Sequence, residues 1–199
     1  MQPLNTYSML SLLTIIFLTF ATEASRLQPA TGPDTDTNTT YTDFIKASCQ
    51  TTKYAELCFK TLSPYAEAIQ INPMELANAA ISVSLKSAKS TSKVVRELSK
   101  GRDVSMRDGQ AVADCLENMS DSVDEMKKSM VEMKRLDGPE FNEKMGNVKT
   151  WVSAALTDED TCMDGFEEND GKMKETIRGF IVNVGELTSN ALALITNIS

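Results

Sequence analysis

Histidine is absent from this chain of 199 residues, which has only one tryptophan and four cysteines. Without histidine, neither a Ser-His-Asp nor a Cys-His triad can form, and no metal site can have a histidine ligand. The cysteines form no Cys-x-x-Cys pair, which argues against a zinc knuckle or a redox motif. A pair of carboxylates can catalyse a reaction without histidine, so acid-base catalysis by Asp and Glu remains possible. Few other enzyme mechanisms remain possible.

Basic residues are outnumbered by acidic ones. Lys plus Arg is 20 and Asp plus Glu is 28, so the formal charge is −8. A chain this acidic is a poor ligand for nucleic acid or for an anionic membrane, and we expect neither as a partner. The hydrophobic share of 41% and the charged share of 24% are typical of a globular protein, and the length suits one domain.

The N-terminal region contains an uncharged hydrophobic run at residues 9–20. This run is shorter than the roughly 20 residues that a transmembrane helix needs, and small residues follow it. We therefore predict a secretory signal peptide over residues 1–24, cleaved after Ala24, and a secreted, extracellular protein. The polar residues 25–40 are predicted to be a disordered leader. No later segment is judged long and apolar enough to span a bilayer.

The rest of the chain is predicted to be all-α. Residues 41–71 carry two cysteines in a compact segment of short helices, and four helical apolar seams follow over residues 72–198. The first helix begins at Asn72-Pro73-Met74-Glu75, a typical N-cap sequence, and Gly101 is its expected stop. The fourth seam repeats at 4-3 spacing in the order Met173, Ile177, Phe180, Val184, Leu187, Ala191, Leu194 and Ile198. Short turns between long helices predict an up-and-down four-helix bundle.

The bundle topology predicts how the four cysteines pair. Cys115 lies early in the second helix of the bundle and Cys162 late in the third. Because these helices are antiparallel, the two ends meet, so we expect a Cys115–Cys162 disulfide. Cys49 and Cys58 are then left to form the second bridge.

Clusters of carboxylates offer weak evidence for chemistry. The stretch that begins at Asp158 fails as an EF-hand, because Cys162 and Met163 occupy the positions that need Asp or Asn and then Gly. Glu117, Asp121 and Asp124 share one face of the second helix, which is more typical of a solvated face than of a glycosidase pair. We therefore expect no enzyme activity, no metal and no cofactor, and a protein that acts by presenting a surface.

Four motifs then resemble the plant invertase/pectin methylesterase inhibitor family, over about residues 41–198. The segments 44–49 (FIKASC) and 51–58 (TTKYAELC) resemble its first cysteine pair, although Ala55 stands where the family often has proline. Segment 111–117 (AVADCLE) resembles its third-cysteine motif, segments 147–157 and 161–166 resemble its fourth, and segment 187–194 (LTSNALAL) resembles its closing helix. The resemblance implies a disulfide-stapled N-terminal helical hairpin (41–71) before the bundle (72–198), with the same cysteine pairing.

The resemblance also implies a function. It predicts a free-standing inhibitor that binds pectin methylesterase stoichiometrically, in a 1:1 complex, blocks its pectin-binding cleft and so regulates pectin de-esterification in the plant cell wall. The implied contact residues are Glu117, Asp121 and Asp124 on the second helix of the bundle, and Thr161 and Asp164 on the third. An acidic helix face suits an enzyme cleft that binds a polyanion.

Two alternatives and the glycosylation sites remain open. The first alternative is an inhibitor of cell-wall or vacuolar acid invertase, although Glu140 replaces the lysine that the invertase branch typically carries. The second is a structural or carrier bundle that binds a small apolar ligand, against which the large seam residues argue. Among the three N-glycosylation sequons, we expect a glycan at Asn38, and the sequence does not decide whether Asn118 and Asn197 are glycosylated.

Overall fold

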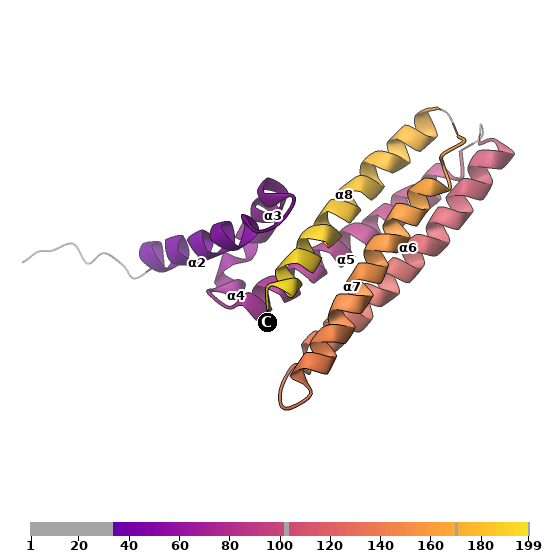
Figure 1. Ribbon diagram of the computed structural model, residues 1–199. Coiled ribbons are helices and arrows are strands. Elements are labelled where there is room, and N and C mark those ends of the chain that lie inside the picture. Colours follow the sequence, from indigo (N-terminus) through magenta and orange to yellow (C-terminus); the bar gives the residue numbers. More distant parts are fainter. Residues whose placement is uncertain (1–33, 102–103, 170, 199) are drawn as a thin grey trace, which may run out of the picture. The chain divides into compact units, whose positions relative to one another are not determined.

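The computed structural model describes residues 34–101, 104–169 and 171–198 (Figure 1). The predicted signal peptide and the first part of the predicted leader lie outside these residues. Every regular element in the described ranges is a helix, and no strand occurs in them.

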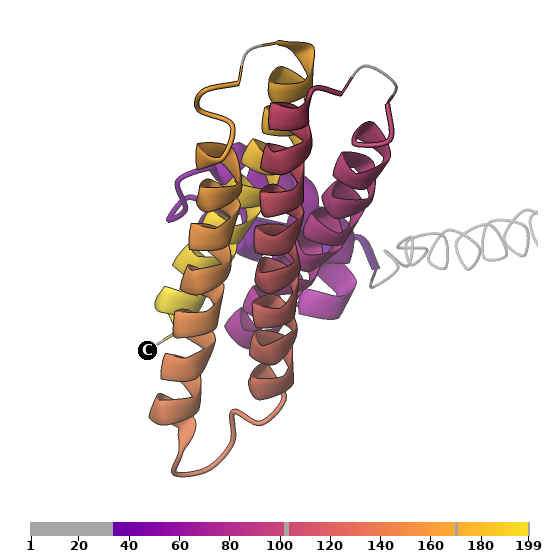
Figure 2. The same cartoon turned by 90° about the vertical axis from the view of Figure 1, so that its right-hand side faces the viewer.

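Four long helices form the bundle, and Figures 1 and 2 show them side by side. They are α5 (Pro73–Leu98), α6 (Met106–Met133), α7 (Phe141–Asp164) and α8 (Lys172–Thr196). Each packs against its neighbours in the chain, and α8 closes the arrangement by packing against α5. The predicted all-α, up-and-down four-helix bundle is confirmed.

The start of α5 follows the predicted capping pattern. The Asn72 side chain accepts hydrogen bonds from the backbone N–H groups of Met74 (2.9 Å) and Glu75 (3.4 Å), and Pro73 occupies the first turn. These contacts satisfy donors that have no partner inside a helix. Gly101, predicted as the C′ residue of this helix, lies one position too far along the chain, because α5 ends at Leu98 and its C-cap is Ser99.

The core of the bundle follows the seams closely but not completely. Ile177, Val184 and Leu194 on α8 are buried as expected, whereas Phe180 is 40% exposed and Ile181 takes its place at 2% exposed. The physical reason is the helical period. A strict 4-3 repeat averages 3.5 residues per turn, whereas a straight α-helix has 3.6, so a seam written at 4-3 spacing drifts around the helix.

A correction concerns the predicted leader. Its last residues, 34–40, belong to α2 (Asp34–Cys49), so a helix begins well before residue 41. The polar composition was misleading because residues 37–40 are an exposed part of a helix that is anchored further on, by buried Ile45 and Cys49. The exposed turns need no apolar face of their own.

The N-terminal helices continue with α3 (Ala55–Leu62), the 3₁₀ helix η1 (Ser63–Tyr65) and α4 (Ala66–Ile69). The predicted Cys49–Cys58 disulfide joins α2 to α3, with Cα atoms 5.6 Å apart. α3 packs on both α5 and α8. The two helices and their disulfide confirm the stapled hairpin that precedes the bundle.

A buried asparagine fastens the hairpin to the bundle. Asn190 on α8 accepts a hydrogen bond from the Tyr54 backbone N–H (3.1 Å) and donates one to the Tyr54 carbonyl (3.0 Å). Its side chain is only 2% exposed. Both backbone groups of one hairpin residue therefore find their partner in a single α8 amide, which fixes the turn before α3 against the bundle.

Helix α8 is more apolar than the sequence analysis recognised. By length and composition it could cross a membrane, with 25 residues and a mean hydropathy of 1.2, so the expectation that no later segment qualifies is wrong by this measure. In the structure 44% of that apolar window is buried inside the protein, and α8 packs against α5 and α7. The core position of α8 accounts for its apolar composition.

Candidate functional site

The second disulfide joins the helices that carry the predicted contact residues. Cys115 on α6 and Cys162 on α7 are bonded, with their Cα atoms 4.1 Å apart, as the antiparallel arrangement predicted. Both cysteines are buried, and none of the four cysteines is free. The bridge therefore fixes the register of α6 against α7 close to Glu117, Thr161 and Asp164.

The five predicted contact residues are all exposed and all lie on this helix pair. We call them the acidic face: Glu117, Asp121 and Asp124 on α6, with Thr161 and Asp164 on α7. Asp114 and Asp164 border the same shallow hollow, which has a volume of about 330 Å³ and spans the start of α6 and the end of α7. The α7 end of the acidic face at Asp164 therefore lies beside the α6 turn that precedes Glu117.

Two members of the acidic face already have partners within the protein. Asp124 accepts a hydrogen bond and an ion pair from Lys127 at 2.7 Å, and this contact lowers the pKa of the Asp124 carboxyl. The Thr161 hydroxyl donates to the Thr157 carbonyl at 2.8 Å. Asp124 is thus ionised but partly neutralised, and the Thr161 hydroxyl stays available only as an acceptor.

Asp121 borders a second pair of acids that the sequence analysis did not single out. Glu125 on α6 and Asp158 on α7 are half-buried and interact with each other. Burial is the largest cause that raises the pKa of each carboxyl, and the negative charge of Asp121 raises both further. The negative charges of Asp121, Glu125 and Asp158 therefore repel one another at this part of the acidic face.

Beneath the acidic face lies a buried polar layer with one residue from each bundle helix: Ser84, Ser122, Glu159 and Thr188, all fully buried. Ser122 donates to Glu159 Oε1 at 2.8 Å, and Thr188 donates to the same oxygen at 3.0 Å. Ser84 and Thr188 share a further hydrogen bond. The layer links α5, α8, α7 and α6 in sequence.

The charge state of Glu159 is set by its burial. Burial is the dominant cause and raises the pKa of Glu159 to about 8, although the hydrogen bonds from Ser122 and Thr188 oppose it. Its second oxygen, Oε2, has no hydrogen-bond partner among the described residues. Glu159 is therefore a neutral acid near pH 6, and the layer holds together without a buried charge.

Sequence reasoning missed Glu159, although a signal was present. The buried residues of α7 follow a 3-4-3-4-3 pattern, and Glu159 occupies a place that the other members give to apolar side chains or cysteine: Met145, Val148, Val152, Ala155, Glu159 and Cys162. A carboxylate in a core position of a seam is rare unless it has partners. Its partners Ser122 and Thr188 lie on other helices, so spacing along the chain could not identify them.

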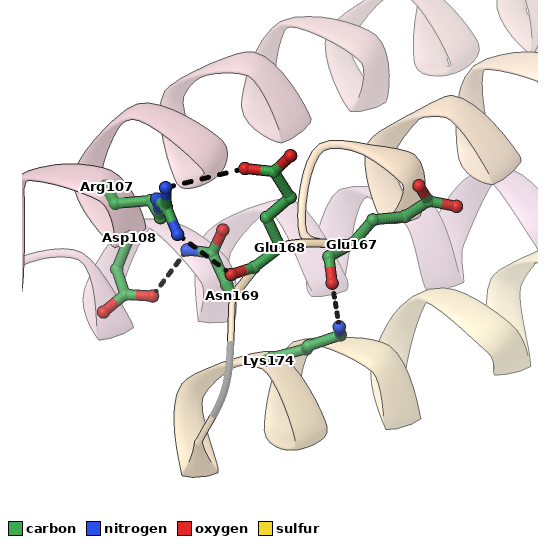
Figure 3. Close-up of polar contacts among 6 residues, drawn as sticks. All are labelled: Arg107, Asp108, Glu167, Glu168, Asn169 and Lys174. Carbon is green, nitrogen blue, oxygen red and sulfur yellow. Dashed lines mark hydrogen bonds and ion pairs between the residues drawn. The ribbon is translucent and has the colours of Figure 1, made fainter.

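The end of the bundle next to the disulfide is closed by polar contacts (Figure 3). Arg107 near the start of α6 donates to the Glu168 carbonyl (3.2 Å) and pairs with its carboxylate (3.5 Å). Asn169 donates to Asp108 at 2.8 Å, and Lys174 on α8 donates to the Glu167 carbonyl at 2.9 Å. These bonds hold the segment after α7 against both α6 and α8, beside Asp164.

The predicted glycosylation sites have different surroundings. Asn38 is exposed on α2, while Asn118 on α6 is half-buried and donates to the Asp114 carbonyl at 3.0 Å. Asn197 follows α8 and donates to the Thr51 hydroxyl at 2.8 Å. Which of them carries a glycan stays a prediction, and the exposure of Asn38 is consistent with the preference for that residue.

The acidic face suits the binding of a partner protein better than the catalysis of a reaction. The side chains of the acidic face are exposed on the outside of two helices, and the described residues contain no group of three or more His, Cys, Asp or Glu that could hold a metal ion. A rigid helix pair with exposed acidic side chains suits a protein-protein contact. The fold and this site define a class of disulfide-bonded helical binding proteins.

Comparison with known proteins gives the family. A family model described as plant invertase/pectin methylesterase inhibitor matches residues 43–194. The 21 kDa protein of Daucus carota is 47% identical over 161 residues, which cover 78% of this chain and 83% of that protein. Pectinesterase inhibitor 10 of Arabidopsis thaliana is 46% identical over 164 residues, 81% of this chain, and the match spans 53% of that relative.

The solved structures agree on the fold. A crystal structure of mutant form A of a pectin methylesterase inhibitor from Arabidopsis matches with a TM-score of 0.62 over 76% of this chain and 95% of that one, at 18% identity. The chain belongs to the plant invertase/pectin methylesterase inhibitor family, and its relatives support the pectin methylesterase inhibitor branch. This is a family of inhibitors, which confirms the expectation that the chain is not an enzyme.

Proposed function

We propose that this protein is secreted to the plant cell wall, binds pectin methylesterase in a 1:1 complex and blocks its pectin-binding cleft. The observation that carries the proposal is the acidic face, held on one helix pair by the Cys115–Cys162 bridge. An enzyme that releases carboxylates from pectin must accommodate a polyanion, so its cleft suits acidic side chains. The inhibitor would keep pectin out of the cleft by occupying it, without catalysing any reaction itself.

An apolar neighbour adds to the acidic face. Val131 is 52% exposed, and half-buried Trp151 borders the same hollow of about 470 Å³, together with Asp124 and Lys128. Protein interfaces usually combine a few aromatic or aliphatic anchors with a charged rim. We propose that this hollow extends the contact surface beyond Asp124, toward the turn between α6 and α7.

The rigidity of the acidic face supports inhibition as well. Its two helices are joined by a disulfide and by the Ser122–Glu159 hydrogen bond, and the Asn169–Asp108 hydrogen bond holds the segment after α7 against α6. A surface that is already ordered loses little conformational entropy when it binds. The side chains that contact the enzyme therefore need only small rearrangements.

The test is a titration of the purified protein against one pectin methylesterase and one acid invertase. We expect the esterase to lose activity in proportion to added protein up to one equivalent, and a 1:1 complex on size-exclusion chromatography. Invertase should be unaffected. Inhibition of invertase alone would overturn the proposal in favour of the other branch of the family.

A further inference from the structure

A second charged surface lies on α5, in a part of the chain that has no acids. No Asp or Glu occurs between Glu75 and Glu97. Within this interval four exposed cations recur at 3-4-3 spacing, which puts them on one side of the helix, and we call them the basic stripe: Lys86, Lys89, Lys93 and Arg96. The stripe extends along about 15 Å of the helix axis.

The cations of the basic stripe have no acidic partner within the part of the chain that the structure describes. Among the described residues, no ion pair involves any of the four, and the acid that follows them, Glu97, pairs with Lys100 at 2.7 Å. Like charges three or four residues apart repel one another and destabilise a helix. The protein keeps four unneutralised cations together although its formal charge is −8.

The basic stripe borders two shallow hollows. One, of about 250 Å³, lies between α5 and α6, and its apolar lining is Leu116, Met119 and Val123. The other, of about 470 Å³, has Leu85 and Met130 as its apolar lining. Lys89 and Lys93 border both, serine hydroxyls complete the lining, and neither hollow contains a carboxylate. Cations, hydroxyls and a thin apolar floor are the groups that an anionic sugar chain would contact.

The basic stripe and the acidic face lie at different places on the bundle. α5 packs against α6 and α8, whereas the acidic face belongs to the α6–α7 pair. Both hollows beside the stripe extend onto α6, but none of their lining residues belongs to the acidic face. Neither hollow beside the stripe is lined by tryptophan, tyrosine or phenylalanine, which single-stranded nucleic acids use for stacking.

We propose that the basic stripe binds a linear polyuronate, the carboxylate-rich chain that remains when the methyl esters of pectin are removed. This identification of the ligand rests on the proposed function, because such a chain is the product of the enzyme that the protein would inhibit. Four cations in a row match regularly spaced carboxylates along one chain. Binding would hold the inhibitor where de-esterification has already occurred.

The experiment measures binding of the full mature protein to unesterified polygalacturonate by calorimetry at low salt, with highly methyl-esterified pectin as the comparison. Wild-type protein should bind the unesterified chain, and added salt should weaken the binding, because the contacts are electrostatic. A variant with Lys86→Gln, Lys89→Gln, Lys93→Gln and Arg96→Gln should bind at least roughly tenfold more weakly. Glutamine is a good helix former, so α5 should persist.

The matched control changes the same kinds of charge elsewhere: Lys46→Gln, Lys60→Gln, Lys172→Gln and Arg178→Gln, all exposed. Equal losses in both variants, or equal binding of esterified pectin, would overturn the proposal. Tighter binding to single-stranded nucleic acid or to anionic lipid vesicles than to polygalacturonate would also overturn it.

A separate measurement distinguishes this inference from the proposed function. Complex formation with the esterase is followed by size-exclusion chromatography without any pectin, and the stripe variant should form the complex as the wild type does. If no complex forms while polygalacturonate still binds through the stripe, only the proposed function fails. If the complex forms and polygalacturonate does not bind, only the present inference fails.

Discussion

The Ser122 hydroxyl donates a hydrogen bond to the buried carboxyl of Glu159 at 2.8 Å, and so joins α6 to α7 in the middle of the bundle. Because burial raises the pKa of Glu159 to about 8, against about 4.5 for the unfolded chain, the folded protein holds one more proton between these values. The contribution of Glu159 to stability is therefore fully present below about pH 4.5 and is lost as pH rises toward about 8.

The first prediction concerns Glu159→Gln. We expect it to unfold with nearly the wild-type free energy at pH 5 and to be more stable than wild type at pH 9, because it cannot ionise. Glu159→Ala should lose roughly 2–4 kcal/mol at pH 5, since it creates a cavity and removes the acceptor of two hydroxyls. Urea unfolding over a pH series measures both. A wild-type stability that increases from pH 5 to pH 9 in parallel with the glutamine variant would contradict the assignment.

A related prediction concerns the half-buried acid pair. The pKa values of Glu125 and Asp158 are raised, mainly by burial, so both carboxyls resist ionisation in the folded state and cost stability as pH rises above their ordinary range. Asp158→Asn should therefore stabilise the protein at pH 7 relative to wild type and have little effect at pH 3. Thermal unfolding at the two pH values tests this. As a control, Asp137→Asn, in the exposed turn after α6, should show no such difference.

The acidic face is tested by charge reversal. Asp121→Lys combined with Asp124→Lys should weaken esterase binding by roughly 100-fold or more, because it opposes like charges across the interface. Helicity by circular dichroism should not change, since both side chains are exposed. The equal charge change Glu75→Lys with Glu143→Lys, on exposed residues away from the face, should leave binding nearly intact. Equal inhibition by both double variants would place the contact elsewhere on the bundle.

Removal of the long disulfide should affect stability more than removal of the short one. Cys115 and Cys162 are 47 residues apart, so loop-closure entropy predicts a loss of about 4 kcal/mol for the double serine variant. The Cys49 and Cys58 double variant, with a separation of 9 residues, should lose roughly 2 to 3 kcal/mol. Denaturant unfolding compares them. A larger loss for the short bridge would show that strain or residual structure dominates over loop length.

The Asn190 amide offers a local test of the hairpin. Asn190→Ala removes both hydrogen bonds to the Tyr54 backbone and should cost about 2 kcal/mol, because buried groups are left without partners. Hydrogen exchange of the amides at residues 51–58 should accelerate more than exchange in α6. Asn197→Ala, which removes only an exposed contact with Thr51, should change stability by about 0.5 kcal/mol or less. Uniform acceleration across all helices would mean that the hairpin and bundle unfold together.

The sequence by itself determined the four helices of the bundle, their order and the pairing of the cysteines. These follow from local information: apolar residues at helical spacing, caps such as Asn72, and short turns that force neighbouring helices to be antiparallel. The position of Cys115 in α6 and of Cys162 in α7 then left only one sensible pairing. The exposed acids of the acidic face could likewise be found from their spacing and flanking motifs.

Only the tertiary structure decided which polar groups are buried and with what partners. Glu159 meets Ser122 and Thr188 from two other helices, and the Asn190 amide meets a backbone that lies 136 residues away. Such contacts depend on how each helix is rotated about its axis and shifted along its neighbours, and only the packing of the helices sets these two quantities. The core shows this, because Ile181 is buried at the place where the sequence spacing predicted Phe180. The charge state of Glu159 depends on that burial, so it too could be read only from the folded chain.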